Sequence, residues 1–370
     1  MNQPWYEVED VANLESPSLL LYRDRVKSNI DLMVAMAGGD TTRLRPHVKT
    51  HKMAEVVRWQ MERGLRKFKC ATIAEAEMLG GAGVDHVLLA YPMIGPNIHR
   101  FIRLNQQFPA TQFACVVDHS SALMGLANAA VIADHCIEVF LDIDCGMHRT
   151  GHIPNREALE LYRLISQTIG IKLAGLHVYD GHIHQPNPAD REAACIEAFQ
   201  PVWKWVEDIR AANLPIPNIV VGGTPTYPIH IRDSRLECSP GTPLLWDFGY
   251  GDKFVDLPFI PAALVLARVL SCPFPGIVCT DLGYKAVASE GPIPRVKFLN
   301  LPEAEHLMHS EEHLVLKVPV GSEPAVGSVL YGVPRHICPT VALYGSAVLI
   351  EGGKVCDQVE GTSRNRHLTI

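Results

Sequence analysis

The sequence predicts an α/β fold, a (β/α)8 TIM-type barrel followed by a mostly β domain. From Leu44, short apolar and β-branched runs alternate with helix-like stretches, which is typical of βα units that build a parallel sheet. Nearer the C-terminus, proline and glycine turns join apolar runs with little helix between them. We expect the barrel over residues 16–250 and the β domain over residues 251–370, with residues 1–15 belonging to the β domain.

Eight barrel strands are expected in order along the chain. They are LRPHVK from Leu44, KFKCAT from Lys67, HVLLAY from His86, QFACVV from Gln112, EVFLDID from Glu138, LAGLHVY from Leu173, NIVVGG from Asn218 and the weaker ECSPG from Glu237. Helical patterns lie between them, such as IAEAEMLGGAG after Cys70, with acidic residues in its first turn and glycines at its end. A doubly wound sheet is the alternative architecture.

Four later segments predict the strands of the β domain. They are FIPAALVLARVLSCP, GIVCTDLG, HLVLKVP and VALYGSAVLIEGGKV. The segment SPSLLLY at Ser16 precedes the first barrel strand and is followed by a helical pattern from Asp24. We expect SPSLLLY to return to the β domain.

Composition excludes several classes of protein. With 47% hydrophobic and 20% charged residues, the chain is too apolar for disorder. A net charge of -7 and the absence of a basic tract with interleaved aromatic residues argue against nucleic acid as a partner. The acidic start MNQPWYEVED is unlike a signal peptide, and no apolar run approaches the roughly 18 residues of a membrane helix. The ten cysteines include no CxxC pair, so we expect a cytoplasmic protein with reduced thiols.

The stretch LRPHVKTHK begins like a buried strand and ends in basic residues. Catalytic groups of such barrels lie at the C-terminal ends of strands, which is where Lys49 falls. Apolar neighbours would desolvate its amine and make it a nucleophile for a carbonyl cofactor. Lys52 would instead begin the next helix. The alternative is a surface turn with two solvated lysines.

Two glycine-containing turns predict a phosphate site. NIVVGGTPT places Gly222, Gly223 and Thr224 after the seventh strand, and SPGT places Ser239 and Gly241 after the eighth. Barrels often bind phosphate there through backbone N–H groups and hydroxyls, and glycines leave those donors open to the anion. Tight turns alone would also explain the glycines. Together with a lysine after the first strand, the turns favour pyridoxal 5'-phosphate as the cofactor.

The same residues carry a family resemblance from about Ser16 to the C-terminus. The ordered motifs RPHVKTHK, CATIAEAEM, DIDCGMHRTG, LHVYDGHIHQ, VVGGTPT and HICPT resemble the D-threonine aldolase and D-serine dehydratase family. The resemblance implies a barrel similar to that of alanine racemase (fold type III), pyridoxal phosphate bound to Lys49, and phosphate held by residues 222–224. It also implies that Arg149 lies near the phenolic oxygen of the cofactor ring and that Tyr179 lines the cofactor pocket.

Arg149 and Tyr179 can each have a structural role instead. The strand EVFLDID ends in Asp142 and Asp144, and the Arg149 guanidinium that follows can pair with either carboxylate or with a ligand oxygen. Tyr179 can be a core residue whose hydroxyl bonds to the backbone.

The motif RHICPT predicts a metal site. His336 and Cys338 lie two residues apart, and alternate side chains of an extended segment point to one side, so both can bind one cation. A buried cysteine beside a surface histidine is the alternative. The resemblance implies that the β domain supplies a divalent metal through this motif, with aspartate in some members where this chain has Cys338. A thiolate favours zinc over manganese or magnesium.

These parts support two reactions on a D-β-hydroxy-α-amino acid. If a base takes the hydroxyl proton, retro-aldol cleavage gives glycine and an aldehyde. If Lys49 takes the α-proton, β-elimination of the D-serine or D-3-hydroxyaspartate dehydratase type gives a 2-oxo acid and ammonia. His182 and His184, just past the sixth strand, are candidate bases for the first route, and the alternative is that they are loop residues. The paired histidines favour the aldolase, and Cys338 favours the dehydratase.

We therefore predict a lyase of the D-threonine aldolase type that depends on pyridoxal phosphate and a divalent metal, with the dehydratase as the first alternative. An amino acid racemase on the same barrel would need no metal. A cofactor-binding protein without turnover would need neither the β domain nor HICPT. The expected partners are a small D-amino acid substrate and a second copy of the chain in a homodimer, with no nucleic acid and no membrane.

Overall fold

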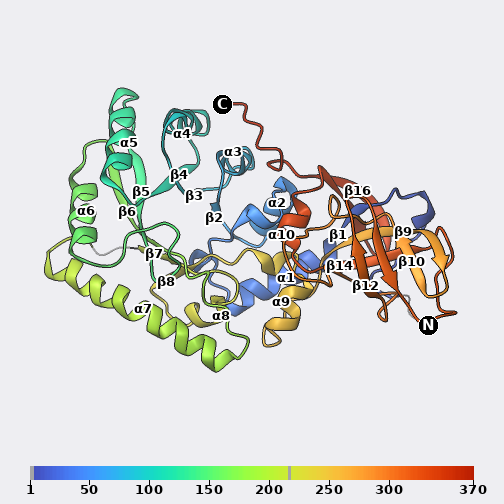
Figure 1. Cartoon of the computed structure of the whole chain (residues 1–370). Helices are drawn as coiled ribbons and strands as arrows, with labels where there is room; N and C mark the ends of the chain where they lie inside the picture. The colour runs from blue at the N-terminus through green and yellow to red at the C-terminus, as the bar shows by residue number, and fades with distance from the viewer. Residues whose placement is uncertain (1–3, 216–217) are drawn as a thin grey trace. The chain divides into compact units, whose positions relative to one another are not determined.

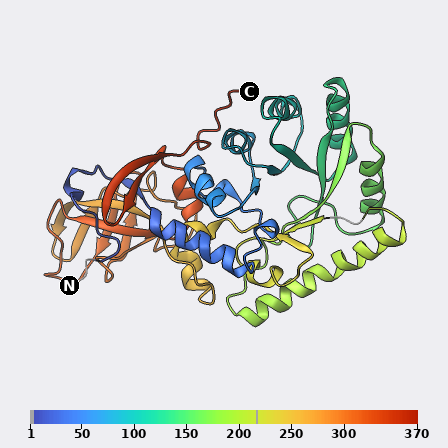
Figure 2. The same cartoon turned by 180° about the vertical axis from the view of Figure 1, so that it is seen from behind.

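A computed structural model describes residues 4–215 and 218–370, and its contacts form two compact units. The barrel unit comprises residues 33–49, 57–241 and 366–370, and the β unit comprises the chain up to Leu32 together with residues 50–56 and 242–365. Figure 1 labels the helices and strands, and Figure 2 shows the same chain from behind. Among the described residues, no helix combines the length and apolar character that a membrane span requires.

The barrel unit is built on a seven-stranded parallel sheet (Figure 1). Its strands are β2 (Lys67–Cys70), β3 (His86–Pro92), β4 (Gln112–Val117), β5 (Ile137–Ile143), β6 (Ile171–Val178), β7 (Asn218–Val221) and β8 (Leu236–Cys238). Each strand pairs with the next one along the chain. This order confirms the predicted barrel class, because a doubly wound sheet would reverse its strand order near the middle.

The prediction of a first strand at LRPHVK is wrong, because this segment makes only isolated bridges. Leu44 bridges Cys238 of β8, and His47 bridges Lys69 of β2. The Lys69 N–H donates to Pro46 O at 2.9 Å, but Pro46 has no N–H of its own and cannot complete a ladder. The segment nevertheless lies between β8 and β2, in the position that an eighth strand would occupy in a closed barrel.

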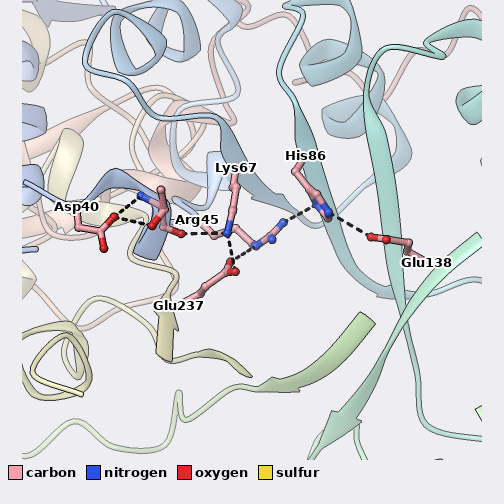
Figure 3. Close-up of polar contacts among 7 residues, drawn as sticks. Asp40, Arg45, Lys67, His86, Glu138 and Glu237 are labelled. Carbon is pink, nitrogen blue, oxygen red and sulfur yellow. Dashed lines mark hydrogen bonds and ion pairs between the residues drawn. The ribbon is translucent and has the colours of Figure 1, made fainter. Parts of the chain in front are cut away.

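A chain of charged side chains lies near the N-terminal ends of these strands (Figure 3). Glu237 accepts hydrogen bonds from Arg45 Nε at 3.0 Å and from Lys67 Nζ at 2.7 Å. Arg45 Nη1 lies 3.1 Å from His86 Nδ1, and His86 Nε2 lies 3.2 Å from Glu138. The network therefore joins the bridging segment to β2, β3, β5 and β8.

The network stabilises the barrel near neutral pH. Burial acts to raise the pKa of Glu237, but the charges of Arg45 and Lys67 outweigh it, so the pKa is lowered. A carboxyl group whose pKa is lower in the folded state stabilises the fold above its unfolded pKa, and this contribution disappears as the pH falls through the folded pKa. Catalytic groups of barrels lie at the C-terminal ends of the strands, so we assign these residues a structural role in stabilising the fold.

Helices follow the strands of the barrel unit. They are α2 (Ala54–Glu62), α3 (Ile73–Gly81), α4 (Pro96–Gln107), α5 (Ser120–Ile132), α6 (Arg156–Gln167), α7 (Pro188–Ala211) and α8 (Tyr227–His230). The predicted helix after Cys70 is α3, and the Thr72 side chain caps it by accepting a hydrogen bond from the Glu75 N–H.

The β unit contains a nine-stranded sheet. Its elements are β1 (Ser18–Tyr22), β9 (Ala263–Phe274), β10 (Ile277–Thr280), β11 (Val296–Phe298), β12 (Glu305–His309), β13 (Leu314–Lys317), β14 (Val329–Pro334), β15 (Ser346–Glu351) and β16 (Lys354–Glu360), with α1 (Arg23–Met36), α9 (Phe248–Lys253) and α10 (Ile337–Val341). Strand β1 pairs with β9 and β15, which confirms that SPSLLLY returns to this sheet. Leu20, Leu264 and Tyr331 are among the residues of its core.

Candidate active site

Three basic side chains lie around the ring of Tyr179, the residue that follows β6. Arg149 Cζ lies 5.0 Å from the ring centroid, and the Nζ atoms of Lys49 and Lys69 each lie 5.7 Å from it. These distances are within the range of cation–π contacts, about 6 Å. The structure thus brings together three of the residues predicted from the sequence and adds Lys69, which was not predicted.

Lys49 lies on a short 3-10 turn (Val48–Thr50), and its side chain is exposed. The expectation that strand neighbours desolvate Lys49 is wrong, because the chain turns after Pro46 instead of continuing as a strand. Lys52 does not begin the next helix either. It has a left-handed backbone, with φ of 58°, and lies two residues before α2.

The desolvated lysine is Lys69, which lies at the end of β2 and is 2% exposed. Burial lowers its pKa to about 7, and the positive charge of Lys49 contributes to the lowering. Its neighbour Phe68 is also fully buried. A lysine inside the run KFKC was the available signal, but alternation along a strand does not reveal which face lines the barrel interior.

The carboxylates that were expected near Arg149 have other donors. Asp142 accepts a hydrogen bond from His177 Nδ1 at 2.7 Å, and Asp144 accepts one from the Gly146 N–H at 2.8 Å. The Arg149 guanidinium lies over the tyrosine ring instead. Its exposed position leaves it accessible to a ligand oxygen.

The turn after β7 requires glycine at one position and tolerates a side chain at the next. Gly222 has φ of +72°, and a Cβ there would lie 2.9 Å from His230 Cδ2. A Cβ on Gly223 would lie 3.5 Å from Tyr179 Cε2, which is an ordinary contact. The predicted phosphate turn therefore adjoins the tyrosine ring that the three basic side chains surround.

The turns after β7 and β8 lie together, and they fit a phosphate group. The Gly241 N–H donates to Thr224 Oγ1 at 3.3 Å. Ser239 is 3% exposed, and its Oγ atom has no hydrogen-bond partner among the described residues. A buried hydroxyl without a partner costs about 1–3 kcal/mol, which a bound anion would offset. The residues present therefore fit the phosphate of pyridoxal phosphate.

Buried polar side chains form hydrogen bonds with one another and with this turn. His230 Nε2 lies 2.7 Å from Asp180 Oδ2 and 3.4 Å from Cys195 Sγ. Thr226 Oγ1 donates to Asp180 Oδ1 at 3.0 Å and accepts from the Gly223 N–H at 3.3 Å. The ligand atoms of the aspartate, cysteine and histidine lie within 4.8 Å of one another, a spacing that suits a cation, but hydrogen bonds already join them. No sequence spacing indicated this cluster.

The extended geometry predicted for His336 and Cys338 is wrong. His336 is the N-cap residue of α10, and Cys338 lies inside that helix. The helix begins here because Asp247 accepts a hydrogen bond from the Ile337 N–H at 3.0 Å. Burial raises the pKa of Asp247 to about 6.

The two side chains nevertheless meet across the first turn of α10. Burial lowers the pKa of His336, but its hydrogen bond with Cys338 and the contact with Glu290 raise it more, to about 9. His336 Nδ1 lies 2.6 Å from Glu290 Oε1, and Cys338 Sγ lies 3.3 Å from Thr50 Oγ1. Imidazole and thiolate are ligand types that a divalent cation such as zinc accepts. Glu290 has no local motif that would have indicated it from the sequence.

The two candidate bases differ in their surroundings. His182 is half-buried, and its Nδ1 atom has no hydrogen-bond partner among the described residues. Its Nε2 atom lies where a Cβ on Gly146 would approach to 2.8 Å. His184 is exposed. His182 is therefore the better shielded from solvent of the two candidate bases.

Replacing Gly223 by valine is expected to weaken pyridoxal phosphate binding by roughly tenfold to a hundredfold. The added side chain occupies space beside the turn that the phosphate would need, and a lost hydrogen bond to a charged group costs about 1.5–3 kcal/mol. Fluorescence titration measures this affinity, and thermal unfolding measures stability. Gly81→Val is the matched control, because nothing lies within 4 Å of a Cβ at Gly81. Lost stability with unchanged affinity would show that Gly223 is only a turn residue.

The fold and the site define the class of the protein. A parallel α/β barrel joined to a β unit is the architecture of alanine racemase-like enzymes, which use pyridoxal phosphate. The chain belongs to the family described as alanine racemase, N-terminal domain, which matches residues 21–242. A putative serine dehydratase domain matches residues 262–350.

Several known proteins are similar to the chain over nearly its whole length. It is 28% identical over 361 residues to a D-threonine aldolase from Arthrobacter sp, covering 96% of this chain and 94% of that protein. It is 24% identical over 384 residues to a D-serine dehydratase from Dictyostelium discoideum, covering 91% and 93%. The solved D-threonine aldolase from Filomicrobium marinum matches with a TM-score of 0.90 and 25% identity, covering 99% of each chain. Aldolases and dehydratases are lyases, so the predicted family, fold and enzyme class are confirmed.

Proposed function

We propose that the chain is a D-threonine aldolase-like lyase, which uses pyridoxal phosphate and a divalent metal to cleave D-β-hydroxy-α-amino acids to glycine and an aldehyde. The grouping of Lys49, Arg149 and the Gly223 turn around Tyr179 carries this proposal. It joins an amine, a guanidinium and an anion-binding turn within one unit, as a phosphorylated aldehyde cofactor requires.

Each candidate site residue of the barrel unit has its own role in binding the cofactor. Gly222, Gly223 and Thr224 bind the phosphate, and Ser239 adds a hydroxyl donor. Lys49 holds the cofactor through its amine, and Arg149 supplies positive charge beside the ring. Pyridoxal phosphate, when bound, accepts the electron pair left at Cα of the substrate.

The metal would be held in the β unit by His336 and Cys338. We propose zinc, because a thiolate ligand prefers it to magnesium or manganese. A divalent cation acts as a Lewis acid toward oxygen ligands such as the substrate hydroxyl. The carboxylate of Glu290 orients the imidazole through the contact at Nδ1, which leaves Nε2 for the cation.

Retro-aldol cleavage needs a base for the β-hydroxyl proton, and His182 supports this route. Its half-buried imidazole has a nitrogen without a partner among the described residues, which leaves that nitrogen free to accept the hydroxyl proton. Dehydration is the second candidate, and Cys338 favours it. That route needs Lys49 to remove the α-proton, after which the hydroxyl leaves.

Product analysis with D-threonine tests the proposal. Glycine and acetaldehyde support the aldolase, whereas 2-oxobutyrate and ammonia show the dehydratase. A substrate deuterated at Cα provides the second readout. Elimination breaks that bond and is slowed by deuterium, whereas retro-aldol cleavage leaves the label in glycine. Formation of L-allo-threonine, the product of inversion at Cα alone, without either product pair would show a racemase instead.

Replacing His182 by asparagine is expected to lower kcat of the aldolase reaction by roughly 10²–10⁴-fold, the usual contribution of a general base. His184→Asn is the matched control and should leave kcat nearly unchanged, because that side chain is exposed. Steady-state kinetics with D-threonine measures both variants. A large loss in the His184 variant alone would transfer the role of the base to His184.

We also propose that the protein acts as a homodimer in the cytoplasm. All ten cysteines are free thiols, which supports a reducing compartment. Light scattering of the purified protein measures the number of subunits.

A further inference from the structure

The barrel unit contains a buried chain of polar groups to which the proposed reaction assigns no task. Lys69 Nζ lies 3.5 Å from His177 Nε2, and His177 Nδ1 lies 2.7 Å from Asp142 Oδ1. Asp142 Oδ2 also accepts a hydrogen bond from Thr150 Oγ1 at 3.0 Å. Lys69, His177 and Asp142 are all buried. This row of hydrogen-bonded groups therefore runs from the Lys69 amine beside Tyr179 to the buried carboxylate of Asp142.

The hydrogen-bond partners of His177 determine which of its two nitrogens carries the proton. An ionised Asp142 can only accept, so His177 Nδ1 is the donor to it. His177 Nε2 is then an acceptor, and it faces Lys69 Nζ. Burial lowers the pKa of His177, which favours the neutral form of the imidazole. Lys69 can therefore accept a proton, and the neutral His177 can stabilise the resulting ammonium group by accepting a hydrogen bond from it.

Charged groups from several elements face Lys69. Lys49 on its 3-10 turn and Arg45 on the bridging segment are positive, whereas Asp142 on β5 and Asp180 after β6 are negative. The positive charges and burial prevail, so the pKa of Lys69 is lowered to about 7. A bound anion would add negative charge on the same side as Tyr179 and would reverse this balance.

We propose that Lys69, held by His177 and Asp142, is a second functional amine of this site and takes up one proton from solvent when the anionic cofactor binds. The proposal rests on the proposed function only in that pyridoxal phosphate binds beside Tyr179. It makes Lys69 a positioning residue, because its ammonium group balances the charge of the bound anion and the carbonyl chemistry remains at Lys49.

The proposal has a defined pH dependence. Below the pKa of free Lys69, the amine is already protonated and binding takes up no proton. Above it, binding requires protonation, so the affinity falls about tenfold for each pH unit until the pKa of the bound state is reached. In a protein without this amine, the affinity for the anion lacks the part of the pH dependence that comes from protonation of Lys69.

Calorimetry with 4'-deoxypyridoxine 5'-phosphate tests the proposal. This probe has no aldehyde and cannot bond to Lys49. Titrations in two buffers of different ionisation enthalpy, from about pH 6 to about pH 9, measure the protons taken up on binding. We expect the wild-type protein to take up close to one proton more than Lys69→Met at the alkaline end, since the probe's own ionisation cancels in the comparison.

Lys69→Arg provides a second variant that keeps the charge without titrating. It should bind the probe with no additional proton and retain its affinity at high pH. If Lys69→Met does not fold, the comparison of wild type with Lys69→Arg decides alone. Equal proton uptake in wild type and variants overturns the proposal. Failure of the wild-type protein to bind the probe at any pH would instead overturn the cofactor assignment itself.

Discussion

Replacing Lys49 by alanine is expected to abolish both the visible absorption of bound pyridoxal phosphate and lyase turnover. The amine of Lys49 is the group that we place in covalent contact with the cofactor aldehyde, and no other group on its turn can replace it. Pyridoxal phosphate should still bind through the phosphate turn, but with the spectrum of the free aldehyde. Absorption spectra and turnover with D-threonine measure the two effects.

Two lysine variants provide the controls for this result. Lys52→Ala should keep both the absorption and the turnover. Lys69→Met should keep the absorption, because Lys69 is assigned a proton and no covalent bond. Absorption that survives in Lys49→Ala and disappears in Lys69→Met would show that the buried amine carries the cofactor. That outcome would contradict the assignment made from the RPHVKTHK motif.

Replacing Cys338 by alanine is expected to lower lyase turnover by about a thousandfold while leaving the cofactor absorption nearly unchanged. A Lewis acid contributes several kcal/mol to a transition state, and about 1.4 kcal/mol corresponds to a factor of ten in rate. The cofactor residues belong to the barrel unit, whereas Cys338 belongs to the β unit. Turnover and absorption of the same preparation measure the two effects separately.

Chelation is expected to reproduce the Cys338 result without any mutation. Zinc should restore the chelated enzyme better than magnesium, because the thiolate prefers the softer ion. Cys279→Ala is the matched control, since Cys279 is a half-buried thiol of the same unit, on β10. Full lyase turnover after exhaustive chelation, with no metal found by elemental analysis, would exclude the metal site and show that the lyase reaction needs no metal.

Much of the barrel could be predicted from local patterns. Seven of the eight expected strands form, because each is a short apolar run whose neighbours in the sheet are also its neighbours in the sequence. The expected first strand, at Leu44, makes only isolated bridges to β8 and β2 and does not form a ladder, because Pro46 interrupts it. Its position depends on Cys238, nearly two hundred residues away, which no local pattern reveals.

The candidate site divides in the same way. The glycine turn and its neighbouring threonine could be recognised because their chemistry depends on a few consecutive residues. His336 and Cys338 could be recognised as a pair, but the helix that joins them begins at the carboxylate of Asp247, far earlier in the chain. Glu290, which contacts His336, likewise comes from a distant segment.

The sequence by itself determined the family, the order of the barrel strands and the residue types of the phosphate turn, because local spacing and side-chain chemistry specify these features. Only the tertiary structure decided which lysine is desolvated. Lys49 follows a strand-like segment yet is exposed, whereas Lys69 is enclosed by side chains from β5, β6 and the bridging segment. Desolvation is a property of everything that surrounds a group, and those surroundings come from residues that are close in space and distant along the chain.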